Sequence, residues 1–379
     1  MMTSYVTWAN KGGIGKSTLS FQLALKYARL NPNKKVIIID MSPQCDVSRM
    51  LLGGGHFNGE QKILDLMTSN TRPTIYRYLE SCVNDVPSGR GWPNSNSYLI
   101  DPNTIRDPNS EQLPSNISMV CGDFDLERIT HSLDNLPQPQ PRGGRVPSGA
   151  HYSAYLLPRT FLRKMVEDFE SEFTDVTVFI DTDPYYSVIT THLALLAADR
   201  LISAYSPSSQ ASQYAVYRSL EFLYDSNYGL VQEVSNQNSL YGSTWFDSLN
   251  NTIVIPNISV AALYIVVSNM NTPQAGRGQA PYSQPQMLHR QSQITVKSRI
   301  DTTLTNLGCS TNYIHDYLWD LKRLGLICDY NGFDLATIQL NASYAEPSNN
   351  GMYYVNSSGG TPIQLSSYNQ RIDTVASYL

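Results

Sequence analysis

The stretch NKGGIGKSTLS, which spans residues 10–20, decides the fold of this chain. It contains three closely spaced glycines, Gly12, Gly13 and Gly15. Glycines let the backbone turn tightly enough to aim several N–H groups at one anion. A β-prone run at residues 4–9 precedes the loop, and leucines at helical spacing follow it through residue 30. A glycine-rich loop between a strand and a helix N-terminus predicts a phosphate-binding site.

Two side chains of this loop have chemistry suited to a nucleoside triphosphate. The Lys16 ammonium is placed to reach the β- and γ-phosphates, and the Ser17 hydroxyl is a ligand for Mg²⁺. The loop departs from the usual G-x-x-x-x-G-K-[ST] pattern, because Asn10 stands where the first glycine would fall, and a second lysine, Lys11, follows it. The residues predicted to bind the nucleotide here are Gly12, Gly13, Ile14, Gly15, Lys16, Ser17 and Thr18.

The order of predicted elements indicates an α/β protein with a doubly wound, mostly parallel sheet. KKVIIID at 34–40 and TDVTVFIDTDP at 174–184 are short β-branched runs typical of buried strands. Residues 159–173 have the periodicity of an amphipathic helix. Residues 191–207 predict a helix followed by a strand, and VAALYIVVSNMN at 260–271 predicts a further strand.

Length and composition bound the domain organisation. The chain has 379 residues, 41% of them apolar, and a formal charge of −5. This is enough apolar material for one elaborated domain, and we interpret residues 1–379 as a single domain. Residues 83–118 and 135–150 are rich in Pro, Ser, Asn and Gly and are predicted surface insertions, and residues 271–345 are a predicted C-terminal elaboration.

Composition also excludes several classes of protein. The acidic balance argues against a globally basic nucleic-acid binder. The five cysteines lie far apart, and the six histidines have no zinc-site spacing, so neither a disulfide framework nor a zinc site is expected. No apolar run of 18 residues and no secretory signal are visible. We therefore expect a cytoplasmic protein with reduced thiols.

The sequence KGGIGKST at 11–18 resembles the deviant Walker A box of the signature-lysine ATPases. This group includes the ParA partition proteins, the MinD proteins and the nitrogenase iron protein, and the resemblance is closest to ParA. In the family, the first lysine reaches across a nucleotide-sandwich dimer to the phosphates held by the other subunit. The resemblance implies this role for Lys11, with ATP and Mg²⁺ as cofactors and a homodimer bridged by ATP. The predicted catalytic residues are Lys11, Lys16 and Asp40.

Two further boxes occur in the family's order. Residues 36–54 are similar to the second box, and residues 178–207 are similar to the Walker B region. Asp40 and Asp181 end the strands of these boxes, where a carboxylate can hold Mg²⁺ through water. The predicted magnesium ligands are Ser17, Asp40 and Asp181. The resemblance also implies that Asn269 contacts the adenine, and an ordinary turn asparagine is the alternative.

One position departs from the family pattern in a way that affects the chemistry. The family's second box reads DxDP, and Ser42 stands here in place of its second aspartate, which is tied to the attacking water. A serine cannot act as a general base near neutral pH, so we predict an ATPase that hydrolyses ATP to ADP and phosphate slowly. Asp46, and Asp183 in place of the proline usual after DT, are two carboxylates that could substitute.

The C-terminal third is the least regular part of the resemblance. Residues 310–327 have apolar side chains at helical spacing, with Gly325 as a helix C-cap, and residues 328–340 fit a hairpin at Asn331-Gly332. We interpret this segment as a family-specific elaboration packed on the main sheet, and the winged helix, whose order of elements it matches, is the alternative. Residues 361–379 resemble the family's last strand and helix.

The expected partners follow from charge and from the resemblance. Residues 277–323 carry six basic residues against three aspartates, a net charge of +3. They are Arg277, Arg290, Lys297, Arg299, Lys322 and Arg323. Such a patch binds phosphate backbones, and ParA proteins bind DNA without sequence preference. We therefore predict a partition or cargo-positioning ATPase whose partners are nonspecific DNA at the nucleoid and an adaptor or cargo protein. The alternative is an ATP-dependent regulatory switch that recruits a protein, with little turnover and no DNA role.

Membrane attachment is not expected. MinD proteins sit on membranes through a basic amphipathic helix at the C-terminus. The last residues of this chain, SYNQRIDTVASYL, contain only one arginine and one aspartate.

Overall fold

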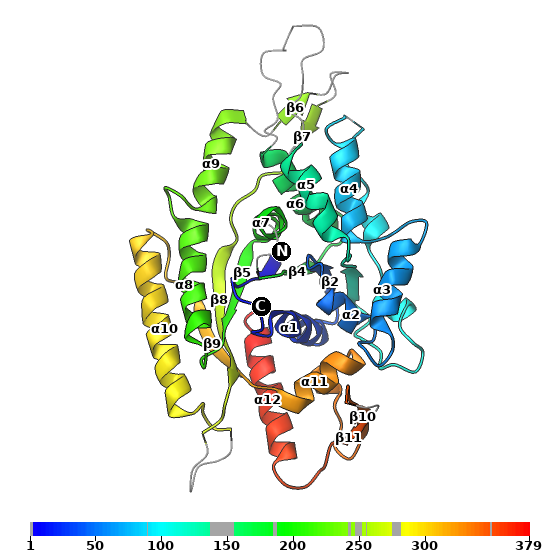
Figure 1. The fold of residues 1–379 in the computed structure, drawn as a ribbon, viewed down its shortest axis with the longest axis vertical. Coiled ribbons are helices and arrows are strands. Elements are labelled where there is room, and N and C mark those ends of the chain that lie inside the picture. Colours follow the sequence, from blue (N-terminus) through cyan, green and yellow to red (C-terminus); the bar gives the residue numbers. More distant parts are fainter. Residues whose placement is uncertain are drawn as a thin grey trace.

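In the computed structural model of the chain, a seven-stranded parallel sheet forms the centre of the molecule (Figure 1). The structure describes residues 3–379 apart from residues 89, 137–154, 185–187, 242–243, 247–251, 255, 275–281 and 349–350. The strands are β1 (Thr3–Thr7), β2 (Lys35–Asp40), β3 (Ile117–Val120), β4 (Val176–Asp181), β5 (Arg200–Tyr205), β8 (Ala262–Asn271) and β9 (Ile314–Trp319). Their order is β3-β2-β4-β1-β5-β8-β9, which confirms the predicted doubly wound α/β fold.

Helices cover both faces of the sheet (Figure 1). One face packs against α1 (Lys16–Leu30), α2 (Asp46–Leu51), α3 (Gly59–Thr68), α11 (Lys322–Asn331) and α12 (Thr361–Ala376). The other packs against α4 (Ile75–Asp85), α5 (Leu126–Asp134), α6 (Leu156–Glu172), α7 (Val188–Ala197), α8 (Gln210–Tyr224), α9 (Leu230–Tyr241) and α10 (Met287–Asn306). None of the helices described here is long and apolar enough to cross a membrane.

Burial on both faces explains why the central strands have unbroken apolar sequences. In β2, Val36 and Ile38 belong to one core, whereas Ile37 and Ile39 belong to the core on the opposite face. Successive side chains of a strand point to opposite faces, so a strand covered on both sides needs apolar residues at every position. This is the reason that the sequence predicted β2 and β4 correctly.

The first predicted insertion packs on the edge of the sheet beside β3. It contains two short 3-10 helices, η1 (Ser95–Tyr98) and η2 (Pro102–Thr104), and Ile100 bridges to Met119 of β3. Arg106 is buried, and its guanidinium donates hydrogen bonds to the carbonyl oxygens of Leu51 and Glu111 at 2.7 and 2.8 Å. The buried side chains of Tyr98, Ile100 and Leu113 in this stretch belong to the apolar cores of the domain. Of the second insertion, only residues 135 and 136 are among the described residues.

The structure contradicts the winged-helix alternative for residues 310–340. Residues 314–319 form the edge strand β9, which pairs in parallel with β8, and Gly325 lies inside α11. The pair Asn331-Gly332 ends α11, with Gly332 in the left-handed conformation (φ 68°), and makes no hairpin turn. The apolar residues of IHDYLW fit both helical and alternating spacing, and pairing with β8 decides for the strand. The segment instead joins the main sheet through β9 and packs on one face of it through α11.

In the part of the chain that the structure describes, four short strands lie outside the main sheet. β10 (Ser343–Ala345) pairs with β11 (Met352–Tyr354), and β6 (Thr244–Phe246) pairs with β7 (Thr252–Val254), both in antiparallel orientation. Residues 361–376 form helix α12 alone, so the strand expected at the start of that stretch is absent there.

Candidate functional site

The glycine loop and the two acidic boxes meet at one edge of the sheet. β1 lies next to β4, and Thr7 pairs in register with Asp181, which in turn is level with Asp40 of β2. From β1 the chain crosses through α1 to β2, whereas from β4 it crosses through α7 on the opposite face to β5. The carboxyl ends of such neighbouring strands form the crevice in which open α/β sheets bind ligands.

The loop has the backbone conformation that its glycines predict. Gly13 and Gly15 have φ values of 72° and 74°, in the left-handed region that other residues rarely adopt. Gly15 directly precedes α1, and no side chain caps that helix N-terminus. The first N–H groups of α1 are therefore free of a capping side chain and suited to an anion.

Lys16 and Lys11 occupy opposite environments in the same loop. Lys16 is 6% exposed, and its ammonium donates a hydrogen bond to the carbonyl oxygen of Lys11 at 2.9 Å. Burial lowers the pKa of Lys16, while the nearby carboxylates of Asp181 and Asp183 raise it. Lys11 is exposed, and its ammonium has no hydrogen bond or ion pair with a described residue.

Asp181 has the environment expected of a cation ligand. Its Oδ1 accepts a hydrogen bond from the Ser20 hydroxyl at 2.6 Å, and its buried Oδ2 has no hydrogen-bond partner among the described residues. Burial and the neighbouring Asp40 raise the pKa of this carboxyl, and the hydroxyls of Ser20 and Ser17 lower it. A divalent cation beside Ser17 and Oδ2 would offset the unfavourable burial of negative charge.

Asp40 is engaged by the segment that follows it. Its two oxygens accept hydrogen bonds from the backbone N–H groups of Ser42 and Ser48 at 3.0 and 2.9 Å. Burial raises the pKa of Asp40, and the hydrogen bonds with Ser48 oppose this rise. A Cβ on Gly122 would lie 3.0 Å from the Asp40 carboxyl carbon, so a glycine there allows close packing. Asp40 thus fixes the path of residues 42–48 at the site.

Ser42 lies against a carboxylate from the neighbouring strand. Its hydroxyl donates a hydrogen bond to Asp183 Oδ1 at 2.8 Å, and both residues are buried. Burial raises the pKa of Asp183 to about 6, although the Ser42 hydrogen bond and the charge of Lys16 lower it. Asp46 instead forms an ion pair with Arg49 at 2.6 Å. The sequence analysis left both aspartates as possible substitutes for the carboxylate missing at position 42. Of the two, Asp183 is the one in contact with Ser42.

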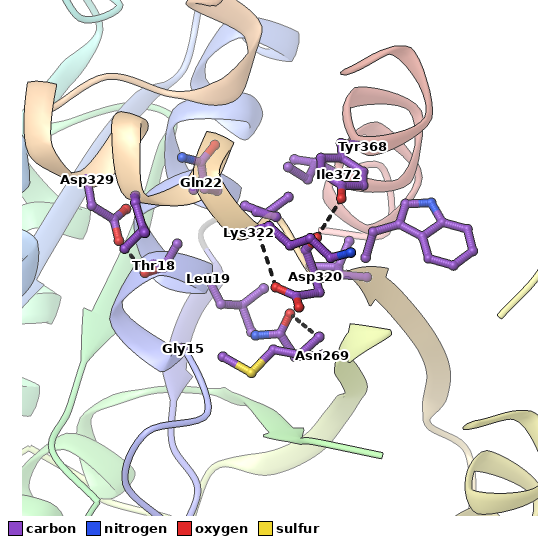
Figure 2. A pocket seen from close by; sticks show the side chains of 16 residues that line it. Gly15, Thr18, Leu19, Gln22, Asn269, Asp320, Lys322, Asp329, Tyr368 and Ile372 are labelled. Atoms are coloured by element: carbon purple, nitrogen blue, oxygen red, sulfur yellow. Dashed lines mark hydrogen bonds between the residues drawn. The ribbon is translucent and has the colours of Figure 1, made fainter. Parts of the chain in front are cut away.

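A cavity of about 320 Å³ opens beside the loop (Figure 2). Gly15, Thr18 and Leu19 line it from the loop and α1, and Asn269 and Trp319 line it from the ends of β8 and β9. Its volume is within the range that small ligands occupy. The cavity therefore extends the phosphate loop by a compartment large enough for a nucleobase.

The sequence comparison agrees with this geometry. A family model described as an AAA domain matches residues 3–238, which is more than half of the chain. The chain belongs to this AAA domain family of ParA- and MinD-like P-loop ATPases. Among curated proteins, none matches the sequence.

Solved structures of this family's fold superpose on most of the chain. Cyanothece McdA without nucleotide shares 15% identity over 89% of this chain and 92% of its own, with a TM-score of 0.52. A variant of Cyanothece McdA in complex with ATP shares 13% identity over 99% and 96%, with a TM-score of 0.54. Protein DIP2308 of Corynebacterium diphtheriae shares 14% identity over 87% and 97%, with a TM-score of 0.50. At these identities the likeness concerns the fold.

Asn269 links the cavity of this P-loop ATPase to its loop. The side-chain amide donates a hydrogen bond to the carbonyl oxygen of Ile14 at 2.8 Å and accepts one from the Met270 N–H at 3.0 Å. Both ends of the amide are thus engaged by the backbone, and Asn269 supports the loop whether or not it also contacts a base.

Residues of β9, α11 and α12 complete the cavity, and the sequence reasoning missed them. Tyr368 donates a hydrogen bond to the backbone carbonyl of Asp320 at 2.6 Å, and the Asp320 carboxylate accepts one from the Lys322 N–H at 3.1 Å (Figure 2). Thr18 donates to Asp329 Oδ2 at 3.0 Å. An aspartate directly after a strand is a signal that could have identified Asp320. The sequence analysis assigned residues 314–319 to a helix and therefore missed it.

Of the six basic residues in the predicted DNA-binding patch, the five that the structure describes fall on separate parts of the domain. Arg290, Lys297 and Arg299 lie on α10, which packs on α8, whereas Lys322 and Arg323 lie on α11, which packs on α2 and β10 (Figure 1). Lys297 pairs with Asp301 and Arg323 pairs with Glu346. Arg277 lies outside the described residues. Continuity in sequence therefore does not produce one basic surface.

Proposed function

We propose that this chain is an ATPase that dimerises around ATP and positions a plasmid or another cargo, binding DNA without sequence preference in its ATP-bound state. One observation carries the proposal: the loop holds a buried lysine, Lys16, beside Asp181 and Asp183, and an exposed lysine, Lys11, at its outer edge. The first arrangement suits the chain's own nucleotide, and the second leaves a cation available to another subunit.

The nucleotide fits along the loop and the adjoining cavity. The loop N–H groups and Lys16 would bind the phosphates, and the base would enter the cavity beside Asn269. Ser17 and Asp181 are the proposed magnesium ligands, and Asp40, which is level with Asp181 on the neighbouring strand, would add negative charge beside them. Phosphate oxygens and water would supply the remaining positions. The bound ion would neutralise charge on the phosphates.

The proposed dimer depends on Lys11. A cluster of phosphates buried between two subunits needs more positive charge than Lys16 and one Mg²⁺ supply. Lys11 is exposed, and Lys16 holds its backbone carbonyl, so the loop presents the Lys11 side chain outward. Replacing it with alanine removes the bridging charge and leaves the chain's own loop backbone intact.

The molar mass in solution tests the dimer. Wild-type protein with ATP and Mg²⁺ should elute at twice the monomer mass by size-exclusion chromatography with light scattering, and Lys11→Ala should remain a monomer that binds ATP. Lys34→Ala, at the opposite end of α1, should dimerise like wild type. An ATP-dependent dimer of Lys11→Ala would refute the role of Lys11.

The separation of the basic residues favours a second candidate function. A regulatory switch would use the ATP dimer to recruit a protein and would need no continuous basic surface. Fluorescence anisotropy with an unrelated duplex separates the candidates: binding that requires ATP and weakens steeply with salt supports cargo positioning on DNA. ATP-dependent dimers that ignore DNA support the switch.

A further inference from the structure

We propose that Asp183, held in place by Ser42, provides the carboxylate that positions the attacking water during ATP hydrolysis. The inference rests on the proposed ATPase function and deepens it. In this chain a carboxylate at the end of β4 would take over from the aspartate that is missing at position 42, after the end of β2.

The two residues occupy equivalent places on neighbouring strands. Ser42 is two residues beyond Asp40 and Asp183 is two residues beyond Asp181, and Asp40 and Asp181 are level in the sheet. The Ser42 hydroxyl bridges the gap with a 2.8 Å hydrogen bond to Asp183 Oδ1. Ser42 is 1% exposed and Asp183 is 7% exposed. A carboxylate at position 183 instead of position 42 therefore still lies within the same buried site.

The segment around Asp183 is fixed against the phosphate loop. The Trp8 indole donates a hydrogen bond to the carbonyl oxygen of Pro184 at 3.1 Å. The Pro184 ring lies 3.6 Å from the position that a Cβ would take on Gly12. The charge of Lys16 also acts on Asp183. The carboxylate therefore stands beside the loop residues that would hold the terminal phosphate.

One oxygen of Asp183 remains available for water. Oδ1 accepts the Ser42 hydrogen bond, whereas Oδ2 is buried and has no hydrogen-bond partner among the described residues. A buried oxygen without a partner is unfavourable, and a water molecule bound there would satisfy it. Both oxygens of Asp40 are already engaged, and Asp46 is paired with Arg49 with its side chain 35% exposed. Among these carboxylates, Asp183 best combines a fixed position with a buried acceptor that has no hydrogen-bond partner among the described residues.

The step that this geometry supports is ordinary phosphoryl transfer to water. The water donates a hydrogen bond to Asp183 Oδ2, and its oxygen forms a bond to the γ-phosphorus. The bond from that phosphorus to the β–γ bridging oxygen breaks, and its electron pair stays on ADP. The products are ADP and inorganic phosphate, with one proton released to solvent near neutral pH. Ser42 donates to Asp183 throughout and is a positioning residue.

Single-turnover hydrolysis tests the assignment. Asp183→Asn should hydrolyse bound ATP about 100-fold more slowly than wild type, because losing a positioned acceptor costs about 10²–10⁴ in rate. Its ATP affinity, measured separately by fluorescent-nucleotide titration, should stay within about threefold. Its ATP-bridged dimer should persist correspondingly longer. Asp46→Asn is the matched control and should hydrolyse ATP at the wild-type rate.

A reciprocal exchange guards against a merely structural effect. The double variant Ser42→Asp/Asp183→Asn places a carboxylate at position 42, after β2. The amide introduced at position 183 can donate a hydrogen bond to it. The double variant should hydrolyse bound ATP at least about tenfold faster than Asp183→Asn does. Recovery supports the exchange of positions, and a double variant that binds ATP but stays as slow as Asp183→Asn contradicts it.

The outcomes for this inference and for the proposed function differ. If wild type and Asp183→Asn bind and hydrolyse ATP equally well, Asp183 is not the positioning carboxylate and the ATPase proposal stands. If wild type neither binds nor hydrolyses ATP, both fall. Thermal unfolding of each variant without nucleotide identifies a variant that has lost its fold. In that case Ser42→Ala replaces it in the test. Ser42→Ala should slow hydrolysis several-fold with little change in ATP affinity.

Discussion

The proposed phosphate side of the candidate site, which is the glycine loop, and its proposed base side, which is the adjoining cavity, are built in different ways. On the phosphate side, one continuous stretch of chain forms a strand exit, a glycine turn and a helix start, and the left-handed glycines at 13 and 15 set its shape. On the base side, the cavity wall comes from α1, β8, β9, α11 and α12, which lie far apart in the sequence.

This difference determines what each side depends on. The shape of the loop follows from local backbone preferences, and its residues would contact the proposed nucleotide directly. The base side depends on how α11 docks beside the turn between α2 and α3, where the Tyr330 carbonyl accepts a hydrogen bond from His56 N–H at 2.8 Å. Changes on the phosphate side should therefore affect binding, and changes on the base side should affect stability and binding together.

The largest expected effect lies on the phosphate side. Lys16→Ala removes a buried cation from the phosphate site and should weaken ATP binding by at least about 100-fold, because charge interactions in a partly buried site are strong. Isothermal titration with a non-hydrolysable ATP analogue measures the loss. Lys34→Ala should bind normally. Unchanged binding by Lys16→Ala would rule out this loop as the phosphate site.

Gly54 tests the docking of α11 on the base side. Its φ is +64°, and a Cβ there would lie 2.4 Å from the carbonyl oxygens of Asp329 and Tyr330, so Gly54→Ala should destabilise the fold by about 2–4 kcal/mol. Gly308→Ala is a matched control, because Gly308 has a similar φ of +69° with open space around it. It should cost only about 1 kcal/mol. Urea unfolding gives both values, and equal losses would show that docking contributes nothing.

Asp329 tests how the base side tolerates a buried charge. Burial raises its pKa from 3.8 to about 6, so the folded state binds the proton more tightly than the unfolded state. Stability from this group is fully present below about pH 4 and is lost as pH rises through 6. Asp329→Asn should therefore be more stable than wild type by about 1–3 kcal/mol at pH 7.5, with little gain near pH 4.

Urea unfolding at the two pH values checks the Asp329 prediction. Asp65→Asn, which removes an exposed carboxylate of α3, should leave stability unchanged at both. A gain for Asp329→Asn that is the same at pH 4 and pH 7.5 would contradict a charge-based cause.

Asn269 stands where the two sides meet, and its expected effect is the smallest. Asn269→Ala removes the hydrogen bond to Ile14 and should weaken ATP binding about tenfold, in line with a loss of about 1–1.5 kcal/mol. Comparing ATP with inorganic triphosphate separates two roles. If Asn269 only supports the loop, both ligands should lose equally, and a loss confined to ATP would assign it to the base.

Particular residues show how far the sequence could lead. Asp40 and Asp181 were found because each ends a buried strand whose apolar run is unambiguous, and the loop was found because its glycines follow a β-prone run. Asp320 and Tyr368 were not found, because the strand before Asp320 also fits a helix and α12 is remote in sequence. The choice between Asp46 and Asp183 needed the contact with Ser42, which joins residues 141 positions apart.

The sequence by itself determined the phosphate loop, the strand–helix alternation and the family, because glycine conformations and apolar periodicity act over a few neighbouring residues. Only the tertiary structure decided that residues 314–319 form a strand and residues 322–331 a helix, that the described basic residues lie apart, and that Ser42 pairs with Asp183. Each of these depends on which distant segments come together in the packed sheet. The spacing of residues within a short segment does not predict such contacts, because burial against a neighbouring element determines them.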